Sequence, residues 1–340
     1  MVQPKAMPSE PEVGVLELSF TTSDLAHTRF AISPLWEVMA SVRRLKDSAD
    51  NALYRPWVEQ VRPRLSASGL DWRLLSELLP DPPRTIPVFI APPPSVPEPD
   101  LDLELTVLRA TSAERVRSGL AGLGTPSSTR LDALRTDPET GLAELAGIIE
   151  AYWELALAPY WPRMLTLLRG DALHRARLLA EGGAQRLLND LDPAITWTSD
   201  SLQVPHRQAS GIKELGGRGL LLVPSVFVWP RVYSITSPNW QPTVRYPPRG
   251  IATLWERTAT RTPEALAAVL GRSRALLLTE LHAPASTTDL ARRTGLTAGG
   301  VSQQLTALRA AGLVSPHRTG RYVLYARTEL AEALLQACDD

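Results

Sequence analysis

The sequence predicts an α+β fold that is mostly helical, and three observations lead to this prediction. Residues 272–328 read, in order, as helix, helix-turn-helix and β-hairpin. Two long runs with apolar residues at helical spacing, 138–157 and 162–191, precede this region. Short β-prone segments separated by Gly, Pro and Asn occupy residues 198–246. We therefore expect an N-terminal helical domain with a small antiparallel sheet, followed by a C-terminal winged helix-turn-helix.

The chain is expected to begin with a flexible tail, residues 1–12. The alternation in VGVLELSF, residues 13–20, predicts a strand, after which Ser23 or Asp24 can cap a helix. A long helix should follow, because apolar residues recur there at helical spacing: Leu35, Val38, Met39, Val42 and Leu45.

A proline-rich stretch separates these early elements from the long helices. Residues 80–100 contain nine prolines, which predicts an extended arm or an ordered loop. Its apolar centre, residues 86–90, should pack on the helices rather than form a free linker. The two long helical runs are expected to form an antiparallel pair, with Pro159 and Pro162 at the corner.

Four segments predict the strands of the small sheet: 198–205, 219–228, 231–236 and 242–246. Prolines punctuate these segments, as is typical of edge strands. We expect the mixed domain to span residues 13–250 and the winged helix-turn-helix to span residues 251–340.

The C-terminal domain has clear helix boundaries. A first helix covers residues 272–282. The second is short, with Ser286 or Thr287 as its N-terminal cap and Gly295 as a left-handed end. A third helix covers residues 298–311, with its inward stripe at i, i+4 and i+7: Val301, Leu305 and Leu308.

The opposite face of the third helix carries small, amide and basic side chains, which fit a major groove: Gly299, Ser302, Gln303, Thr306 and Arg309. Two strands follow, 313–317 and 322–326. The turn between them contains a glycine flanked by two arginines, Arg318 and Arg321. This hairpin predicts a wing.

Charge favours DNA as the partner of this region. Residues 262–328 hold eight arginines against three acidic residues, a net charge of +5, although the whole chain has a net charge of zero. A local basic excess is what neutralisation of DNA phosphates requires. The longest apolar stretch, 219–230, is too short and too interrupted by proline to cross a bilayer, and the first twelve residues lack the apolar run of a signal peptide. We therefore expect a cytoplasmic protein without a membrane partner.

The sequence favours a protein without cofactor, metal or enzymatic activity. Its single cysteine, Cys338, excludes an internal disulfide and leaves too few thiolates for a soft metal. The turn at residues 216–219 resembles a phosphate loop, but a strand follows it, which favours a hairpin turn. Asp171, His174 and Glu181 lie on one predicted helix; a metal or acid-base site there is the alternative to a solvated or salt-bridged face.

Three motifs, STTDLARRTGLT, GGVSQQLTALRAAGLV and RTGRYVLY, resemble the winged-helix domains of the arsenic-repressor (ArsR/SmtB) family of bacterial transcription regulators. A serine of the family matches Ser302, whereas Gln304 stands where members usually have His. Glutamine pairs with an adenine edge, so Gln304 favours an A·T pair. The segments WEVMASVRRL, IPVFIAPPP and GGRGLLLVPSVFVWP resemble the uncharacterised (DUF5937-like) N-terminal domain of actinomycete regulators.

The resemblance implies a regulator of transcription that binds double-stranded DNA. We expect a homodimeric repressor that reads an inverted repeat with helix 298–311 and wing 313–327. Base edges should face Ser302, Gln303, Gln304 and Thr306. Phosphates or the flanking minor groove should face Thr297, Arg309, Arg318 and Arg321.

Members of this family pair through their first and terminal helices, and both ends of this domain have apolar faces that suit pairing: Leu266, Val269, Leu270, Leu330, Leu334 and Leu335. The alternative is a protein-interaction or ligand-binding protein whose winged helix serves for dimerisation.

The N-terminal domain is a candidate for binding an apolar small-molecule effector. All nine tryptophans precede residue 262. Large aromatic side chains normally fill cores, but they also line ligand pockets. The candidate walls are Trp153 and Trp161 on the predicted helix pair, with Trp229 and Tyr233 on the sheet.

Overall fold

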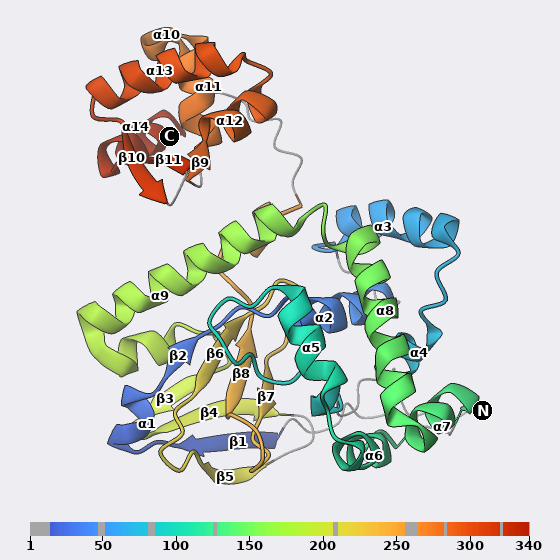
Figure 1. Cartoon of the computed structure of the whole chain (residues 1–340). Helices are drawn as coiled ribbons and strands as arrows, with labels where there is room; N and C mark the ends of the chain where they lie inside the picture. The colour runs from blue at the N-terminus through green and yellow to red at the C-terminus, as the bar shows by residue number, and fades with distance from the viewer. Residues whose placement is uncertain are drawn as a thin grey trace, which may run out of the picture. The chain divides into compact units, whose positions relative to one another are not determined.

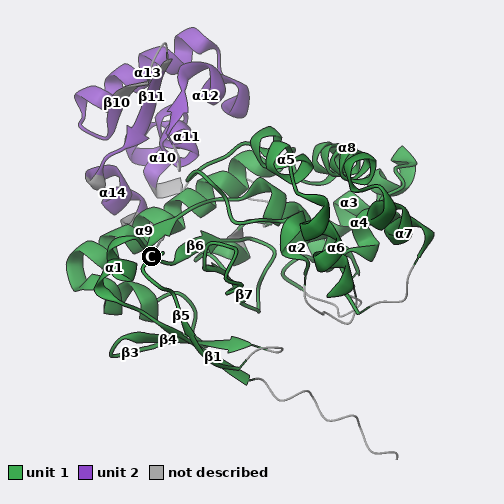
Figure 2. Cartoon of the chain, turned by 60° about the horizontal axis from the view of Figure 1, so that its bottom comes forward, with its two compact units in different colours: residues 1–255 green, residues 256–340 purple. Residues whose placement is uncertain are grey.

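The computed structural model describes residues 14–46, 52–80, 86–124, 128–206, 210–255, 264–281, 284–319 and 322–339. The chain forms two compact units, residues 1–255 and 256–340 (Figure 2). The predicted class is confirmed: the fold is mostly helical, with small sheets and a C-terminal helix-turn-helix with a wing. In the parts that the structure describes, no helix has the length and apolar character needed to cross a membrane.

The helices of the first unit are α1 Thr22–Ala26, α2 Pro34–Lys46, α3 Arg55–Ser68, α4 Arg73–Glu77, the 3-10 turn Val88–Ile90, α5 Leu101–Arg109, α6 Ala113–Ala121, α7 Thr129–Thr136, α8 Pro138–Ala156, α9 Trp161–Asn189 and a second 3-10 turn, Ile251–Thr253. Helix α8 packs against α3, α4, α5 and α7 and contributes its buried face to a large apolar core (Figure 1). Phe89 and Ile90 are buried in the same core, so the proline-rich segment packs on the helices as predicted.

Local sequence explains where α8 begins and why one of its faces is buried. The Asp137 carboxylate accepts a hydrogen bond from the amide of Thr140, and Pro138 occupies the first turn, where its missing N–H costs nothing. Its apolar residues then recur at helical spacing and are buried: Leu142, Leu145, Ala146 and Ile149.

Two buried carboxyl groups hold α2 in place. Glu37 accepts hydrogen bonds from the backbone amides of Val226 and Phe227, and burial raises its pKa to about 8. Glu104 on α5 caps the start of α2, accepting from the Leu35 amide at 2.7 Å and from the Ser33 hydroxyl at 2.6 Å. Each carboxyl group thus satisfies backbone donors that would otherwise be buried without a partner.

The first unit contains two four-stranded sheets. One has the order β3-β4-β1-β5, built from β1 Gly14–Ser19, β3 Thr196–Thr198, β4 Ser201–His206 and β5 Gly211–Glu214. The other has the order β2-β6-β8-β7, built from β2 Arg29–Phe30, β6 Leu221–Pro224, β7 Tyr233–Ile235 and β8 Thr243–Tyr246.

These sheets correct the expectation of a single antiparallel sheet. Strands β1 and β2 come from the start of the chain, and they pair in parallel with β5 and β6 respectively. Strands β6 and β8 are also parallel, because the intervening β7 lies at the edge, beyond β8. Such long-range pairings leave no signal in local hydrophobic alternation.

Two further expectations for this unit differ from the structure. Thr21, rather than Ser23 or Asp24, is the N-cap of α1, and Asp24 completes a capping box with it. The predicted antiparallel pair is wrong, because α9 turns away from α8 after their corner and runs toward β3 and β6 (Figure 1).

A buried polar network joins α9 to β8. Asp171 accepts hydrogen bonds from the Arg175 guanidinium and the Tyr246 hydroxyl, both at 2.9 Å, and from the Arg249 amide. Arg175 is itself buried and also pairs with Asp190 at 3.0 Å. Since both oxygens of the Asp171 carboxylate have donors, this residue is a structural anchor between helix and sheet.

The second unit comprises α10 Glu264–Leu270, α11 Arg272–Glu280, β9 Ala285–Ser286, α12 Thr287–Thr294, α13 Ala298–Ala310, β10 Val314–Thr319, β11 Tyr322–Arg327 and α14 Glu329–Asp339. Its separate core includes the inward stripe of α13, Val301, Leu305 and Leu308. The strands form a three-stranded antiparallel sheet of order β10-β11-β9.

Candidate nucleic-acid interface

The helix-turn-helix is formed by α12 and α13, and short-range capping sets its geometry. The Ser286 hydroxyl accepts a hydrogen bond from the Asp289 amide at 3.2 Å and donates to the Asp289 carboxylate at 2.7 Å. The latter bond holds the pKa of Asp289 below its usual value. Gly295 ends α12 with φ +72°, a conformation that costs glycine little. Thr297 then caps α13 by accepting from the Gly300 amide.

The residues of α13 that are predicted to contact DNA lie along the face of this helix that points away from the core. Ser302, Gln303, Thr306 and Arg309 are exposed, and Gln304 is half-buried. The Thr306 hydroxyl donates its proton to the backbone oxygen of Ser302 at 2.9 Å. Thr306 therefore offers an acceptor oxygen and a methyl group, rather than a hydroxyl donor, to anything that meets this face.

Thr297 is exposed at the N-terminus of α13, but its hydroxyl oxygen already serves as the cap. Its remaining hydroxyl proton, together with the unpaired amides of the first helical turn, can donate to a phosphate. The structure thus brings Thr297 and the five α13 residues Ser302, Gln303, Gln304, Thr306 and Arg309 into one helical element with a polar outer surface.

The wing is a regular hairpin, in which Val314 pairs with Arg327 and Thr319 pairs with Tyr322. Arg318 lies within β10 opposite Val323, but its side chain is outside the described part of the structure. Arg321 lies outside the described residues altogether.

Two arginines on α12 also belong to the candidate interface, although they are not among the contacts predicted from the sequence. Arg292 and Arg293 are exposed in the last turn of this helix, and Arg292 pairs with Asp289 at 3.0 Å. The first helix of a helix-turn-helix crosses the DNA backbone, so exposed basic residues at its end can bind phosphates. Their position just before the glycine that ends α12 is the signal that identifies them.

Arg327, by contrast, is directed inward. Its guanidinium donates to the backbone oxygens of Leu278 and Thr279 at the end of α11 and pairs with Glu332 on α14 at 3.3 Å. Its side chain is only 12% exposed. Arg327 thus links α11, β11 and α14. Because its charge is used within the unit, the charge of residues 262–328 that is available to DNA is one less than their net charge of +5.

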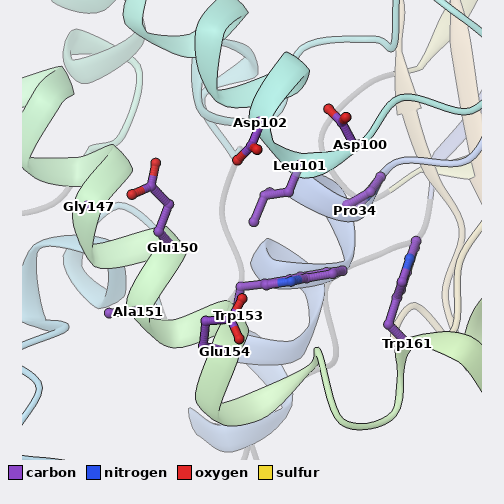
Figure 3. A pocket seen from close by; sticks show the side chains of 10 residues that line it. All are labelled: Pro34, Asp100, Leu101, Asp102, Gly147, Glu150, Ala151, Trp153, Glu154 and Trp161. Atoms are coloured by element: carbon purple, nitrogen blue, oxygen red, sulfur yellow. The ribbon is translucent and has the colours of Figure 1, made fainter.

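The four predicted pocket residues do not converge in the first unit. Trp153 and Trp161 meet edge to face, with ring centroids 5.0 Å apart, and both line a cleft of about 690 Å³ (Figure 3). Tyr233 instead packs against Trp36 and Arg43, and Trp229 is 41% exposed. Neither of these two residues lines the cleft.

The other candidates from the sequence make contacts within the protein. In the turn at residues 216–219, the Gly219 amide donates to the Asp24 carboxylate at 3.0 Å, so this amide already has an acceptor within the protein. Glu181 lies far along α9 from Asp171 and pairs with Arg186. No group of three or more His, Cys, Asp or Glu side chains suited to a metal occurs in the described residues.

Comparison with known proteins agrees with this geometry. Residues 271–315 match the family described as bacterial regulatory protein, arsR family, and residues 111–251 match a family of unknown function, DUF5937. The chain is also similar to the HTH-type transcriptional regulator NmtR of Mycobacterium tuberculosis. The two are 37% identical over 92 residues, which cover 26% of this chain and 77% of that protein. No solved structure matches the chain.

The matched segments include both helices of the helix-turn-helix, with their caps, and the start of the wing. The chain belongs to the ArsR family of bacterial regulatory proteins, and its C-terminal unit is that of a DNA-binding transcriptional regulator.

Proposed function

We propose that this regulator is a cytoplasmic homodimeric repressor, in which two copies of α13 read an inverted repeat and the N-terminal unit responds to a small-molecule effector. One observation carries the proposal: the outer face of α13 is a continuous polar surface without acidic or bulky apolar residues, next to exposed arginines. Such a surface fits a major groove between phosphates. We assign the first unit to regulation and the second unit to DNA binding.

Exposed apolar residues on the terminal helices of the second unit support the homodimer. Val269 on α10 is 80% exposed and Leu330 on α14 is 60% exposed. The two helices contact each other and bury Leu266 and Leu335 in the core of the same unit. A second copy that covers Val269 and Leu330 would remove large apolar side chains from water. Dimeric helix-turn-helix proteins bind half-sites about one helical turn of DNA apart, and we expect the same spacing here.

We assign different tasks to the polar and the basic residues. Ser302, Gln303, Gln304 and Thr306 face base edges, where a glutamine amide can pair with adenine. Thr297, Arg309, Arg318 and Arg321 bind phosphates or the flanking minor groove, and Arg293 adds a phosphate contact from α12. Phosphate contacts supply affinity, and base contacts supply sequence preference.

A pair of variants tests this division. Arg309→Ala should weaken binding to operator and unrelated duplexes alike, and should reduce the slope of log affinity against log salt by about one. Gln304→Ala should leave that slope unchanged but reduce the preference for one base pair in each half-site. Fluorescence anisotropy of labelled duplexes at several salt concentrations measures both effects.

Circular dichroism of both variants provides the control for folding. Arg309 is exposed, so its replacement should not alter the fold. If both variants lose affinity equally and without a change in salt dependence, the proposed contacts are wrong. The winged helix would then serve for dimerisation or for binding a protein.

A further inference from the structure

A cleft in the first unit has the size of a small-molecule site. It has a volume of about 690 Å³ and lies where α5 and α8 approach the first residues of α2 and α9 (Figure 3). Small-molecule pockets commonly range from about 300 to 1,000 Å³. The cleft is therefore large enough for a ligand with several rings.

Two indole rings form one wall of this cleft. Trp153 comes from α8 and Trp161 from the start of α9, and their planes meet at 63°. Both side chains are half-buried, so each is fixed by packing yet keeps part of its surface open to the cleft. Figure 3 shows the Trp153 ring extending across the cleft toward Trp161. The negative face of an indole attracts a cation more strongly than any other aromatic side chain does.

The charged side chains of the lining are acidic. Beside small and apolar residues, four carboxylates line the cleft, Asp100, Asp102, Glu150 and Glu154, and none of the described residues that line it is basic. Two of them are engaged within the protein: Asp100 caps α5 by accepting from the Leu103 amide, and Glu150 pairs with Arg109 at 2.5 Å. Asp102 and Glu154 make no side-chain hydrogen bond or ion pair with other described residues. Their charges therefore remain available to a ligand.

The indole rings and the carboxylates together indicate which class of ligand the cleft can bind. An anion would be repelled by the free carboxylates of Asp102 and Glu154, and a neutral apolar compound would leave them without a partner. A metal ion does not suit the site, because these carboxylates do not converge into a group of three within the described residues. An organic cation with an aromatic or apolar body satisfies both walls: its body packs on Trp153 and Trp161, and its charge faces Asp102 and Glu154.

We propose that this cleft binds an organic cation, and, in the part that rests on the proposed function, that this cation is the effector. The sequence predicts an apolar effector, whereas the cleft favours a cation. Of the four aromatic residues predicted to line the pocket, only Trp153 and Trp161 line the cleft. Trp229 and Tyr233 have no part in it.

Two probes of the same shape and opposite charge test the binding site directly. Tetraphenylphosphonium is a cation and tetraphenylborate an anion, and calorimetric titration of the full chain measures the affinity for each in the absence of DNA. We expect tetraphenylphosphonium to bind at least about tenfold more tightly, with a preference that shrinks as salt is added. Equal binding of both probes, tighter binding of the anion, or no binding of the cation would overturn the proposal.

Variants locate the site. The double variant Asp102→Asn with Glu154→Gln removes only charge, and it should weaken binding of the cation about tenfold, since each exposed carboxylate contributes a few-fold. Glu144→Gln is the matched control: it removes an exposed carboxylate from the same helix, α8, outside the cleft, and should leave the affinity unchanged. Equal affinities of the double variant and the wild type would place the cation elsewhere and overturn the assignment.

DNA binding then tests the role of the site separately. We expect tetraphenylphosphonium to change the affinity of the wild type for its operator several-fold and to leave that of the double variant unchanged. If the cation binds the cleft as described but alters DNA affinity in neither protein, the effector role is overturned and the binding site stands. If the wild type binds no operator at all, the proposed function fails, and the calorimetric result still decides the binding site.

Discussion

Replacing Ser302 with glutamate is expected to weaken operator binding by about a hundredfold or more, a loss of about 2.7 kcal/mol. Ser302 is exposed on the polar face of α13, so the new carboxylate would enter the groove close to base edges and phosphates. Like charges at such short distance repel strongly, and the repulsion grows where the interface excludes water. Anisotropy titration of a labelled operator measures the loss.

Ser302→Gln is the control for size at the same position. It matches glutamate in shape but has no charge, and it should weaken binding far less, by about tenfold at most. Both variants should keep the helical circular dichroism spectrum of the wild type, because the Ser302 side chain does not contribute to the core. Equal losses from glutamate and glutamine, or no loss from either, would show that this face of α13 does not meet DNA.

Replacing Asp171 with alanine is expected to destabilise the first unit by about 3 to 5 kcal/mol, which corresponds to a fall in Tm of roughly 10 °C. The Asp171 side chain is completely buried and accepts three hydrogen bonds, including one from the buried guanidinium of Arg175. Its removal leaves that guanidinium and the Tyr246 hydroxyl without their buried acceptor. All nine tryptophans lie in residues 1–255, so thermal unfolding followed by tryptophan fluorescence reports on this unit alone.

Glu181→Ala serves as the matched control, since it removes an exposed carboxylate from the same helix, α9. Glu181 pairs with Arg186 at the surface, where an ion pair contributes little to stability. We expect its Tm to equal that of the wild type. A similar small effect of Asp171→Ala would contradict the account of α9 and β8 as elements joined by a buried carboxylate.

The winged helix could be predicted from sequence because local interactions determine most of its boundaries. The cap of α12 is a hydroxyl three residues before a carboxylate, its end is a glycine with positive φ, and the inward stripe of α13 follows from a spacing of four and three residues. These signals lie within a few residues of the structure that they specify.

The first unit could be predicted only in part, for the opposite reason. Its long helices have strong periodicity, but the packing partners of α8 and α9 are set by residues far away in sequence. Tyr246 joins α9 to a strand 75 positions later, and Glu37 accepts from amides near residue 226. The parallel pairing of β2 with β6 likewise joins Phe30 to Leu222. A short stretch of sequence around any one of these residues does not indicate its distant partner.

The same limit applies to the candidate ligand site. Aromatic content suggested a pocket, and the contact between Trp153 and Trp161 follows from their places on either side of one helix corner. The acidic character of the cleft did not follow from the sequence, because Asp100 and Asp102 reach it from α5, about fifty residues before Glu150 and Glu154. Residues that favour cations are thus brought together only by the fold.

The central claim, that the C-terminal unit reads a specific DNA sequence, is tested most directly by one titration of the full chain. Labelled DNA from upstream of the protein's own coding region is compared with an unrelated duplex by fluorescence anisotropy at several salt concentrations. The account predicts tight binding of the upstream DNA that weakens steeply with salt, at least about a thousandfold stronger than binding of the unrelated duplex. Weak and equal binding of both duplexes would contradict it.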